Sequence, residues 1–340
     1  MNNKKQMIRN GILFIVLLIA TFMIIFHNYD FNKTINTMLE VNIFYVILGI
    51  IMMIIYFLCE SINIKNILLS LGKDISLIRC IKYTLTGFFF SGITPAASGG
   101  QPMEIYYMKK EGIPVSNSTL ALLVQFCSFK IIMISFGVIG AVLNYNLLNG
   151  GFIWAFIIGL VLNTIAFIAM MIGLFGHKTS KRIIDFLLSI LEKIGYSKYE
   201  VVKENTNDML KNYYEGSKFI KKNKNIFIKA LLIVLVQMLA YYSVPYFVYR
   251  SFGLNQYSII SIIFMQATLF ITSSSIPLPG SIGISETSFL KIYLTIFGNS
   301  ILASAMLLNR TINFYIFMLI GVIVVLSIII NNKKRIYNSK

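Results

Sequence analysis

The chain is poor in charge, and above all in negative charge. Asp and Glu number 13 among its 340 residues, against 30 Lys and Arg, while 57% of the residues are hydrophobic. A soluble domain with this balance would precipitate, so the composition predicts a polytopic membrane protein. The formal net charge of +17 then comes mostly from loops that meet anionic lipid headgroups. It does not indicate a nucleic-acid surface.

Several chemical motifs are also missing. The sequence has no Gly-x-x-x-x-Gly-Lys phosphate loop, no HExxH helix and no Gly-x-Ser-x-Gly elbow, which argues against the nucleotide, zinc and serine-hydrolase chemistry of those motifs. Cys59, Cys80 and Cys127 lie in or beside apolar runs, without the spacing of zinc ligands or disulfides, and are expected to be buried hydrophobes. We expect no catalytic residue, no metal and no cofactor.

What the chain does have is a series of apolar runs with two breaks. Residues 94–104 and residues 276–286 each contain two prolines, two glycines and a final glutamate. Irregular backbone at membrane depth is tolerated only where protein buries it or where it lines a wet cavity. Two such breaks, one in each half, indicate a transport site built on repeats. For either break alone, a surface loop between short helices is the alternative.

The charges of the loops predict the topology. Basic residues flank the first broken segment, residues 83–108, at both ends, so we expect a hairpin that enters from the cytoplasm. The uncharged loop before residue 259 places the start of the second broken segment, residues 259–297, outside. Its end must also be outside if residues 301–330 are the last span and the basic residues after them are inside. The chain is therefore predicted to be an all-α, multi-pass membrane protein with two inverted re-entrant hairpins and both termini in the cytoplasm. Full spans are expected at residues 11–26, 41–58, 118–143, 152–175, 226–249 and 301–330.

A single transmembrane domain is expected over residues 1–340. Its first half covers about 1–175 and its second half about 227–332, with residues 176–226 between them as the one long polar region. Apolar residues recur there at helical spacing among many lysines. This pattern predicts two amphipathic helices lying on the inner leaflet, with a solvated connector as the alternative.

Few ionisable residues stand inside the spans. Each is a functional hypothesis, because a charge at mid-depth costs at least about 2.5 kcal/mol. Glu104 and Glu286 follow the two breaks, and Lys130 and Arg310 lie deep enough in their spans to pair with them. Pairing Glu104 with Lys130, and Glu286 with Arg310, would cancel charge and leave a polar cavity. Pairs that only lock helices together are the alternative.

The predicted substrate path combines these charges with the residues of the breaks. Cations together with the free amides of broken helices suit a phosphate headgroup. Glu60 and Arg250 are expected nearer the ends of their spans. The candidate substrate-binding residues are Thr94, Pro95, Ser98, Gly99, Gly100, Gln101, Glu104, Lys130, Pro279, Gly280, Gly283, Glu286 and Arg310.

The two breaks resemble the signatures of the lysylphosphatidylglycerol synthase transmembrane-region family, whose members are often called flippase-like membrane proteins. The resemblance covers nearly the whole chain in length and span pattern. It implies an integral protein of the bacterial cell membrane that binds or translocates an anionic or aminoacylated phospholipid. In bifunctional members, a cytosolic transferase domain follows this region and moves lysine from charged tRNA to phosphatidylglycerol. This chain stops at Lys340, so a separate transferase would be a partner.

Two alternatives remain open. The family name implies lysyl transfer from lysyl-tRNA to phosphatidylglycerol, which contributes to resistance against cationic antimicrobial peptides. A non-transporting scaffold in envelope lipid assembly is the other alternative. The residues favour a non-enzyme, because an acceptor site for aminoacyl-tRNA needs a domain on the order of 100 residues. Membrane phospholipids are the expected partners, without direct contact to nucleic acid. The lipid, the energy source and the oligomeric state stay open.

Overall fold

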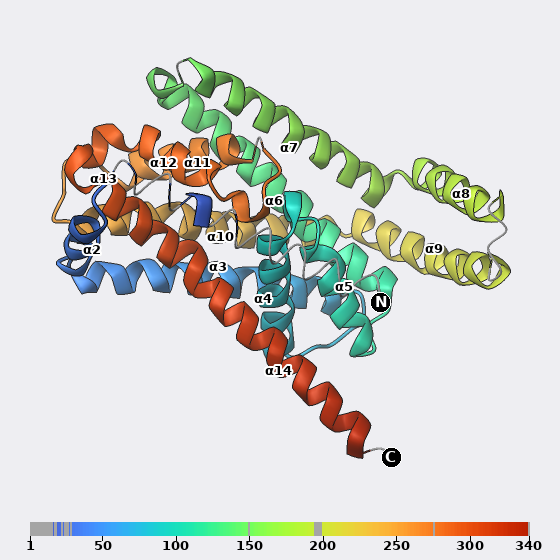
Figure 1. The fold of residues 1–340 in the computed structure, drawn as a ribbon. Coiled ribbons are helices and arrows are strands. Elements are labelled where there is room, and N and C mark those ends of the chain that lie inside the picture. Colours follow the sequence, from blue (N-terminus) through green and yellow to red (C-terminus); the bar gives the residue numbers. More distant parts are fainter. Residues whose placement is uncertain are drawn as a thin grey trace.

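The computed structural model describes residues 29–148, 150–193, 199–274 and 276–338, and before them residues 16, 19–21, 23 and 27. Every regular element within these residues is helical, which confirms the all-α class. The predicted first span, residues 11–26, lies mostly outside them. Five helical runs of the described chain are long and apolar enough to cross a membrane (Figure 1): α3 (Ile43–Ser70), α6 (Val115–Leu143), α7 (Gly151–Phe175), α10 (Lys224–Ser251) and Leu294–Ile330.

The last of these runs is built from three pieces. It comprises α13 (Leu294–Arg310), a π-helical turn η4 (Thr311–Tyr315) and α14 (Ile316–Asn338). The helical run begins at Leu294, before residue 301, where the sequence predicts the start of the span. A non-helical residue, Gly298 with φ 65°, bends α13 near its start.

The second span also extends beyond its predicted end. The sequence places that end at residue 58, but α3 continues to Ser70. The continuation buries Ile64, Ile67 and Leu68 completely or nearly so, at 0–1% exposure. Apolar packing on one face therefore carries the helix through residues that read as a polar loop. As a result, Glu60 lies inside a continuous span and is 9% exposed.

Two hairpins interrupt the long spans. The first consists of α4 (Leu77–Ile93), the short turn η1 (Pro95–Ala97) and α5 (Gly100–Lys110). The second consists of α11 (Ile259–Ser273), η3 (Pro279–Ser281) and α12 (Ile284–Ile292). In Figure 1, α11 and α12 lie with α13 and α2 (Phe31–Leu39) at one end of the bundle, and α5 lies toward the other end. The re-entrant position of both hairpins in a bilayer stays a prediction.

The core is arranged along α3 and α10. These two helices make the most extensive contact between elements of the described chain. One cluster of buried residues joins them to α11, α12 and α13, and includes Tyr293 and Met306. A second cluster joins them to α4, α5 and α6, and includes Tyr83 and Met108. The Phe88 side chain packs against both clusters, so each hairpin has its own core and the two cores meet at the middle.

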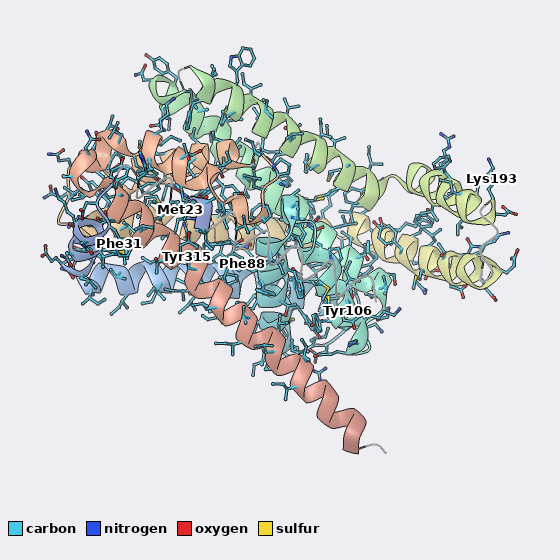
Figure 2. The ribbon with its side chains drawn as sticks, viewed as in Figure 1. Met23, Phe31, Phe88, Tyr106, Lys193 and Tyr315 are labelled. Carbon is cyan, nitrogen blue, oxygen red and sulfur yellow. The ribbon has the colours of Figure 1, made fainter. Side chains whose placement is uncertain are left out.

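Two helices connect the halves, as the sequence predicts. They are α8 (His177–Lys193) and α9 (Tyr199–Lys222), and Figure 2 shows Lys193 at the end of this pair that lies far from the bundle. The Tyr213 hydroxyl donates a hydrogen bond to the Gly173 carbonyl oxygen at 2.6 Å. A Cβ added at Gly216 would lie 2.5 Å from Leu120 Cδ1. The α9 helix therefore packs directly on α6 and α7. At the opposite ends of α6 and α7, the turn η2 (Tyr145–Leu147) joins them.

The loop charges predict that α9 is cytoplasmic and η2 external. In a version without the three native cysteines, Tyr145→Cys should react with an impermeant thiol reagent in intact cells. Lys211→Cys should react only after the membrane is opened. Both native side chains are exposed, so accessibility in the folded protein does not limit either reaction. Labelling of Lys211→Cys in intact cells would contradict the topology.

Candidate functional site

The two breaks, which are far apart in the sequence, touch each other. The tips η1 and η3 are in contact, and the Ala96 backbone N–H donates to the Pro277 carbonyl oxygen at 3.2 Å. A Cβ added at Gly280 would lie 3.2 Å from the Gly92 carbonyl oxygen, so the second tip also approaches the backbone of α4. The prediction that both breaks contribute to one place in the molecule is consistent with this contact.

Both tips use left-handed backbone. Ala96, Ala97 and Ser281 have φ of 53°, 55° and 52°, and Gly280 has φ of 59°. For a residue with a side chain this conformation costs roughly 1–2 kcal/mol. Local strain of this kind persists only where the surrounding structure imposes it, and it clusters at functional sites. The residues of the first tip, Pro95, Ala96, Ala97 and Ser98, are exposed, so the irregular backbone is accessible from outside the protein.

Thr94 shapes the first break. Its hydroxyl donates to the Phe90 carbonyl oxygen at 2.6 Å and accepts from the Gly99 N–H at 2.9 Å. A Cβ at Gly99 would lie 2.7 Å from Thr94 Cγ2, and a Cβ at Gly100 would lie 2.0 Å from Ser91 Oγ. Both glycines are therefore needed for the close return of α5 onto α4.

Arg310 and Glu286 hold the second break. The Arg310 Nε donates to Glu286 Oε1 at 2.7 Å, and Nη2 donates to the Gly280 carbonyl oxygen at 3.0 Å. The other carboxylate oxygen, Glu286 Oε2, accepts from the Gly283 N–H at 2.7 Å. Both side chains are buried, with 5% and 2% exposure. The predicted pairing of these two residues is confirmed, and the pair also fixes two backbone groups of the break.

The π turn follows Arg310 directly and lies near the middle of the Leu294–Ile330 run. The Arg310 guanidinium lies 4.4 Å from the centre of the Phe314 ring. On either side of Arg310, Asn309 and Asn313 are buried, and neither side-chain oxygen has a hydrogen-bond partner. Single π turns inside α-helices occur frequently at functional sites. The break, the ion pair and the π turn thus form one polar region at mid-length of a span.

The predicted pairing of Glu104 with Lys130 is wrong. Glu104 is 3% exposed and packs against Gly87, where an added Cβ would lie 1.8 Å from Glu104 Oε1. Its other oxygen, Oε2, has no hydrogen-bond partner. The two acids follow similar breaks, but the packing of α5 against α4 turns Glu104 toward α4 and away from the Lys130 amine.

Lys130 lies close to the second break instead. Its ammonium donates to Asn163 Oδ1, and Asn163 Nδ2 in turn donates to Ser274 Oγ at 2.6 Å. Lys130, Asn163 and Ser274 therefore link α6, α7 and the end of α11. The Lys130 side chain is partly exposed, and no carboxylate of the described residues lies within 4 Å of its amine. It is a cation inside a span without a neutralising acid.

A buried chain of polar side chains joins α3, α6 and α10, and it includes Glu60, which the sequence predicted nearer the end of its span. Gln237 Nε2 donates to Glu60 Oε2 at 3.0 Å, and Gln125 Nε2 donates to Gln237 Oε1 at 3.1 Å. Asn63 Nδ2 donates to Gln125 Oε1 at the far end of the chain. The signal was present in the sequence, because extending α3 to Ser70 would have placed Glu60 inside an apolar helix.

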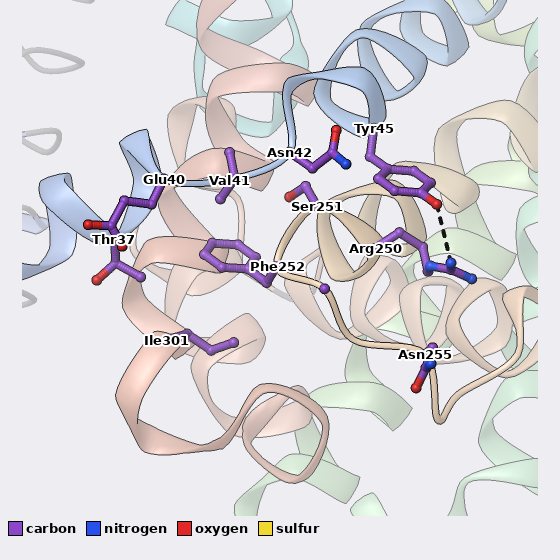
Figure 3. Close-up of a pocket in the computed structure, with 11 residues that line it drawn as sticks. Thr37, Glu40, Val41, Asn42, Tyr45, Arg250, Ser251, Phe252, Asn255 and Ile301 are labelled. Atoms are coloured by element: carbon purple, nitrogen blue, oxygen red, sulfur yellow. Dashed lines mark hydrogen bonds between the residues drawn. The ribbon is translucent and has the colours of Figure 1, made fainter.

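A pocket of about 760 Å³ opens at the end of the bundle formed by α2, α10 and α13. Arg250 lines it and donates to the Tyr45 hydroxyl at 3.2 Å. Figure 3 shows Arg250 and Glu40 on opposite sides of this pocket. No carboxylate of the described chain lies within 4 Å of the Arg250 guanidinium, so this cation is also available to a ligand anion.

Comparison with known proteins gives a consistent family assignment. A family model described as the lysylphosphatidylglycerol synthase TM region matches residues 10–321. A UPF0104 membrane protein of Archaeoglobus fulgidus is 22% identical over 323 residues, covering 94% of this chain and 97% of the relative. A UPF0104 membrane protein of Pyrococcus horikoshii is 24% identical over 317 residues, covering 91% and 93%.

The ion pair makes a prediction about stability. Glu286→Gln removes one partner of a buried pair and leaves the Arg310 charge uncompensated, which typically costs about 3–5 kcal/mol. Glu104→Gln is the matched variant, because it changes an equally buried acid that has no cation beside it. We expect a clearly lower Tm in detergent for Glu286→Gln than for Glu104→Gln. Equal Tm values would mean that the pair does not stabilise the fold.

The close approach at the second tip makes another prediction. Gly280→Leu should abolish function, because the new Cβ would lie 2.6 Å from Phe314 Cζ in addition to the cost of φ +59°. Gly112→Leu is the control, since Gly112 has φ +87° and nothing within 4 Å of an added Cβ. The measurement is activity per amount of folded protein, and equal activity of both variants would show that the tip is an ordinary loop.

Proposed function

Because this chain belongs to the lysylphosphatidylglycerol synthase transmembrane-region family, we propose that it binds an anionic or aminoacylated phospholipid and moves it across the cell membrane. The chain is a multi-pass protein of that membrane, with both termini in the cytoplasm. Lysylphosphatidylglycerol is the lipid that the family description suggests. Membrane phospholipids are then its principal partners, and a separate aminoacyl transferase would supply an aminoacylated lipid.

One observation carries this proposal, namely the contact between two strained helix breaks, of which the first is exposed. Exposed irregular backbone at membrane depth is compatible with a bilayer only where it lines a wet cavity. Discontinuous helices that meet near the bilayer midplane are typical of transport sites. The left-handed backbone at Ala96 and Ser281 keeps both breaks non-helical at this contact. Arg310 holds the second break through its hydrogen bond to the Gly280 carbonyl oxygen.

The charges support an anionic headgroup. The Glu286–Arg310 pair is neutral overall, so the described cations that remain without a nearby acid decide which charge the path attracts. Lys130 is such a cation within the spans, and Arg250 is another at the pocket at their end. A phosphate accepts charge-assisted hydrogen bonds from both kinds of side chain. We assign Lys130 to the phosphate on the path, and Arg250 to the phosphate at one end of it.

An experiment in two hosts distinguishes lipid transport from the synthase and scaffold alternatives. We expect that the protein makes no lysylphosphatidylglycerol in a host that lacks the lipid. In a host that makes it with a separate transferase, the protein should raise the outer-leaflet fraction without changing the total. New lipid in the first host would favour the synthase. Unchanged leaflet distribution in the second host would favour the scaffold or a different lipid.

Removing the charge of Lys130 tests whether this residue binds the phosphate on the lipid path. Hydrogen bonds to charged groups contribute about 1.5–3 kcal/mol, so Lys130→Gln should reduce transport about tenfold or more. Lys211→Gln on the exposed surface of α9 is the control and should transport normally. The readout is the initial rate of movement of a fluorescent phosphatidylglycerol between leaflets of reconstituted vesicles. An unchanged rate for Lys130→Gln would remove this residue from the path.

A further inference from the structure

The two halves of the molecule treat their buried acids differently. In the second half, Glu286 is matched by Arg310 at 2.7 Å. In the first half, Glu104 is as deeply buried, yet no lysine or arginine of the described residues lies within 4 Å of it. A second acid, Glu60, lies in the same region. The first half therefore has two acids without a cation nearby, whereas the second half has an acid paired with a base.

Contacts between α3 and α4 locate Glu60 beside Glu104. The Phe57 and Phe88 rings lie 5.0 Å apart, and Ser61 Oγ donates to Thr84 Oγ1 at 3.2 Å. Glu60 therefore lies opposite the turn of α4 between Thr84 and Phe88. That turn contains Gly87, against which the Glu104 carboxylate packs.

The hydrogen bonds around the two acids are unequal. Glu60 Oε2 accepts from Gln237, at the end of the amide chain. Glu104 Oε2 has no partner, although it is fully enclosed. Such surroundings favour a carboxylate at Glu60 and a protonated acid at Glu104, because two like charges side by side in an apolar interior cannot both form.

The other groups that face the two acids do not supply a positive charge. Tyr56 lies one helical turn before Glu60 on α3, and Tyr241 of α10 packs on Tyr56 with ring centres 5.5 Å apart. From α4 and α6 the neighbours are Thr84 and Gln125, which are uncharged. A metal ion does not fit well either, since no group of three acid, histidine or cysteine side chains exists in the described chain. The carboxylate is so close to Gly87 that an added Cβ there would lie 1.8 Å from Glu104 Oε1.

We propose that Glu104 and Glu60 together hold one proton, and that its uptake and release drive the movement of lipid. The step is a simple ionisation, in which the carboxyl O–H bond of Glu104 breaks, the proton forms an O–H bond with a water molecule to give hydronium, and Glu104 becomes a carboxylate. The coupling to lipid rests on the proposed function, whereas the proton site itself does not.

The structure provides a route from this site to the breaks. Glu104 is on α5, and α5 begins at the first break. Ionisation of Glu104 creates two neighbouring negative charges and pushes α5 away from α3 and from Gly87. The tip that leads into α5 touches the second hairpin through Ala96 and Pro277. A charge change on α5 is therefore transmitted to the contact between the two breaks.

The proton site can be tested without lipid. Infrared spectra of the purified protein in detergent should show the carbonyl stretch of a protonated carboxyl group at neutral pH. Glu104→Gln should remove this band, and Glu60→Gln should change the pH at which it disappears. Glu215→Gln, on the exposed surface of α9, should leave it intact. A spectrum in which Glu104→Gln loses no band overturns the proton site.

The coupling is tested in vesicles that contain a fluorescent phosphatidylglycerol. For the unmodified protein, a pH gradient should change the rate of lipid movement severalfold relative to equal pH on both sides. For Glu104→Gln the ratio of the two rates should fall to about one, whereas Glu215→Gln should keep it. Gly87→Ala displaces the Glu104 carboxylate without removing an acid, and should reduce the ratio as well.

The outcomes separate the two proposals. Lipid movement that ignores the gradient in the unmodified protein overturns the coupling and leaves the proposed function intact. A protonated band at Glu104 with no lipid movement under any condition supports the proton site and rejects the lipid function. A band that is lost in Glu104→Gln, together with a gradient response lost in the same variant, supports both.

Discussion

The structure depends most on the hydrogen bonds of Arg310, a cation that is only 5% exposed inside the last span. Its guanidinium binds the Glu286 carboxylate and the Gly280 carbonyl oxygen, and Glu286 binds the Gly283 N–H. Through these contacts the last span holds the second broken hairpin in its left-handed shape. That shape in turn allows the second tip to reach the first. Without the guanidinium, the Glu286 carboxylate and the Gly280 carbonyl oxygen would each lose a partner in the apolar interior.

The sequence predicts the two breaks, the acids that follow them and the Glu286–Arg310 pair, because each depends on residue types that are rare inside apolar runs. It does not predict the partner of Glu104. The spacing from Glu104 to Lys130 is similar to that from Glu286 to Arg310. Spacing alone therefore predicts an ion pair in both halves. The direction of the Glu104 side chain depends on the absence of a Cβ at Gly87, and that contact between α4 and α5 is visible only in three dimensions.

The length of α3 shows a second limit on what can be predicted from the sequence. Residues 59–70 contain polar groups that, read singly, indicate a loop. In the structure Glu60, Ser61 and Asn63 all have buried partners or neighbours on α4, α6 and α10. A buried polar network therefore looks like a surface segment until its partners, which lie 23 to 177 residues away, are known. The least predictable part of the site is the part that depends on such distant partners.

The π turn lets one span face both hairpins. A π turn holds one residue more than an α-helical turn, so it offsets the faces of α14 by about 100° relative to those of α13. Beyond the turn, Gly92 of α4 packs on Met318, and Gly321 of α14 packs on Phe89. The last span therefore presents Arg310 to the second break and, after the turn, Met318 and Gly321 to the first hairpin.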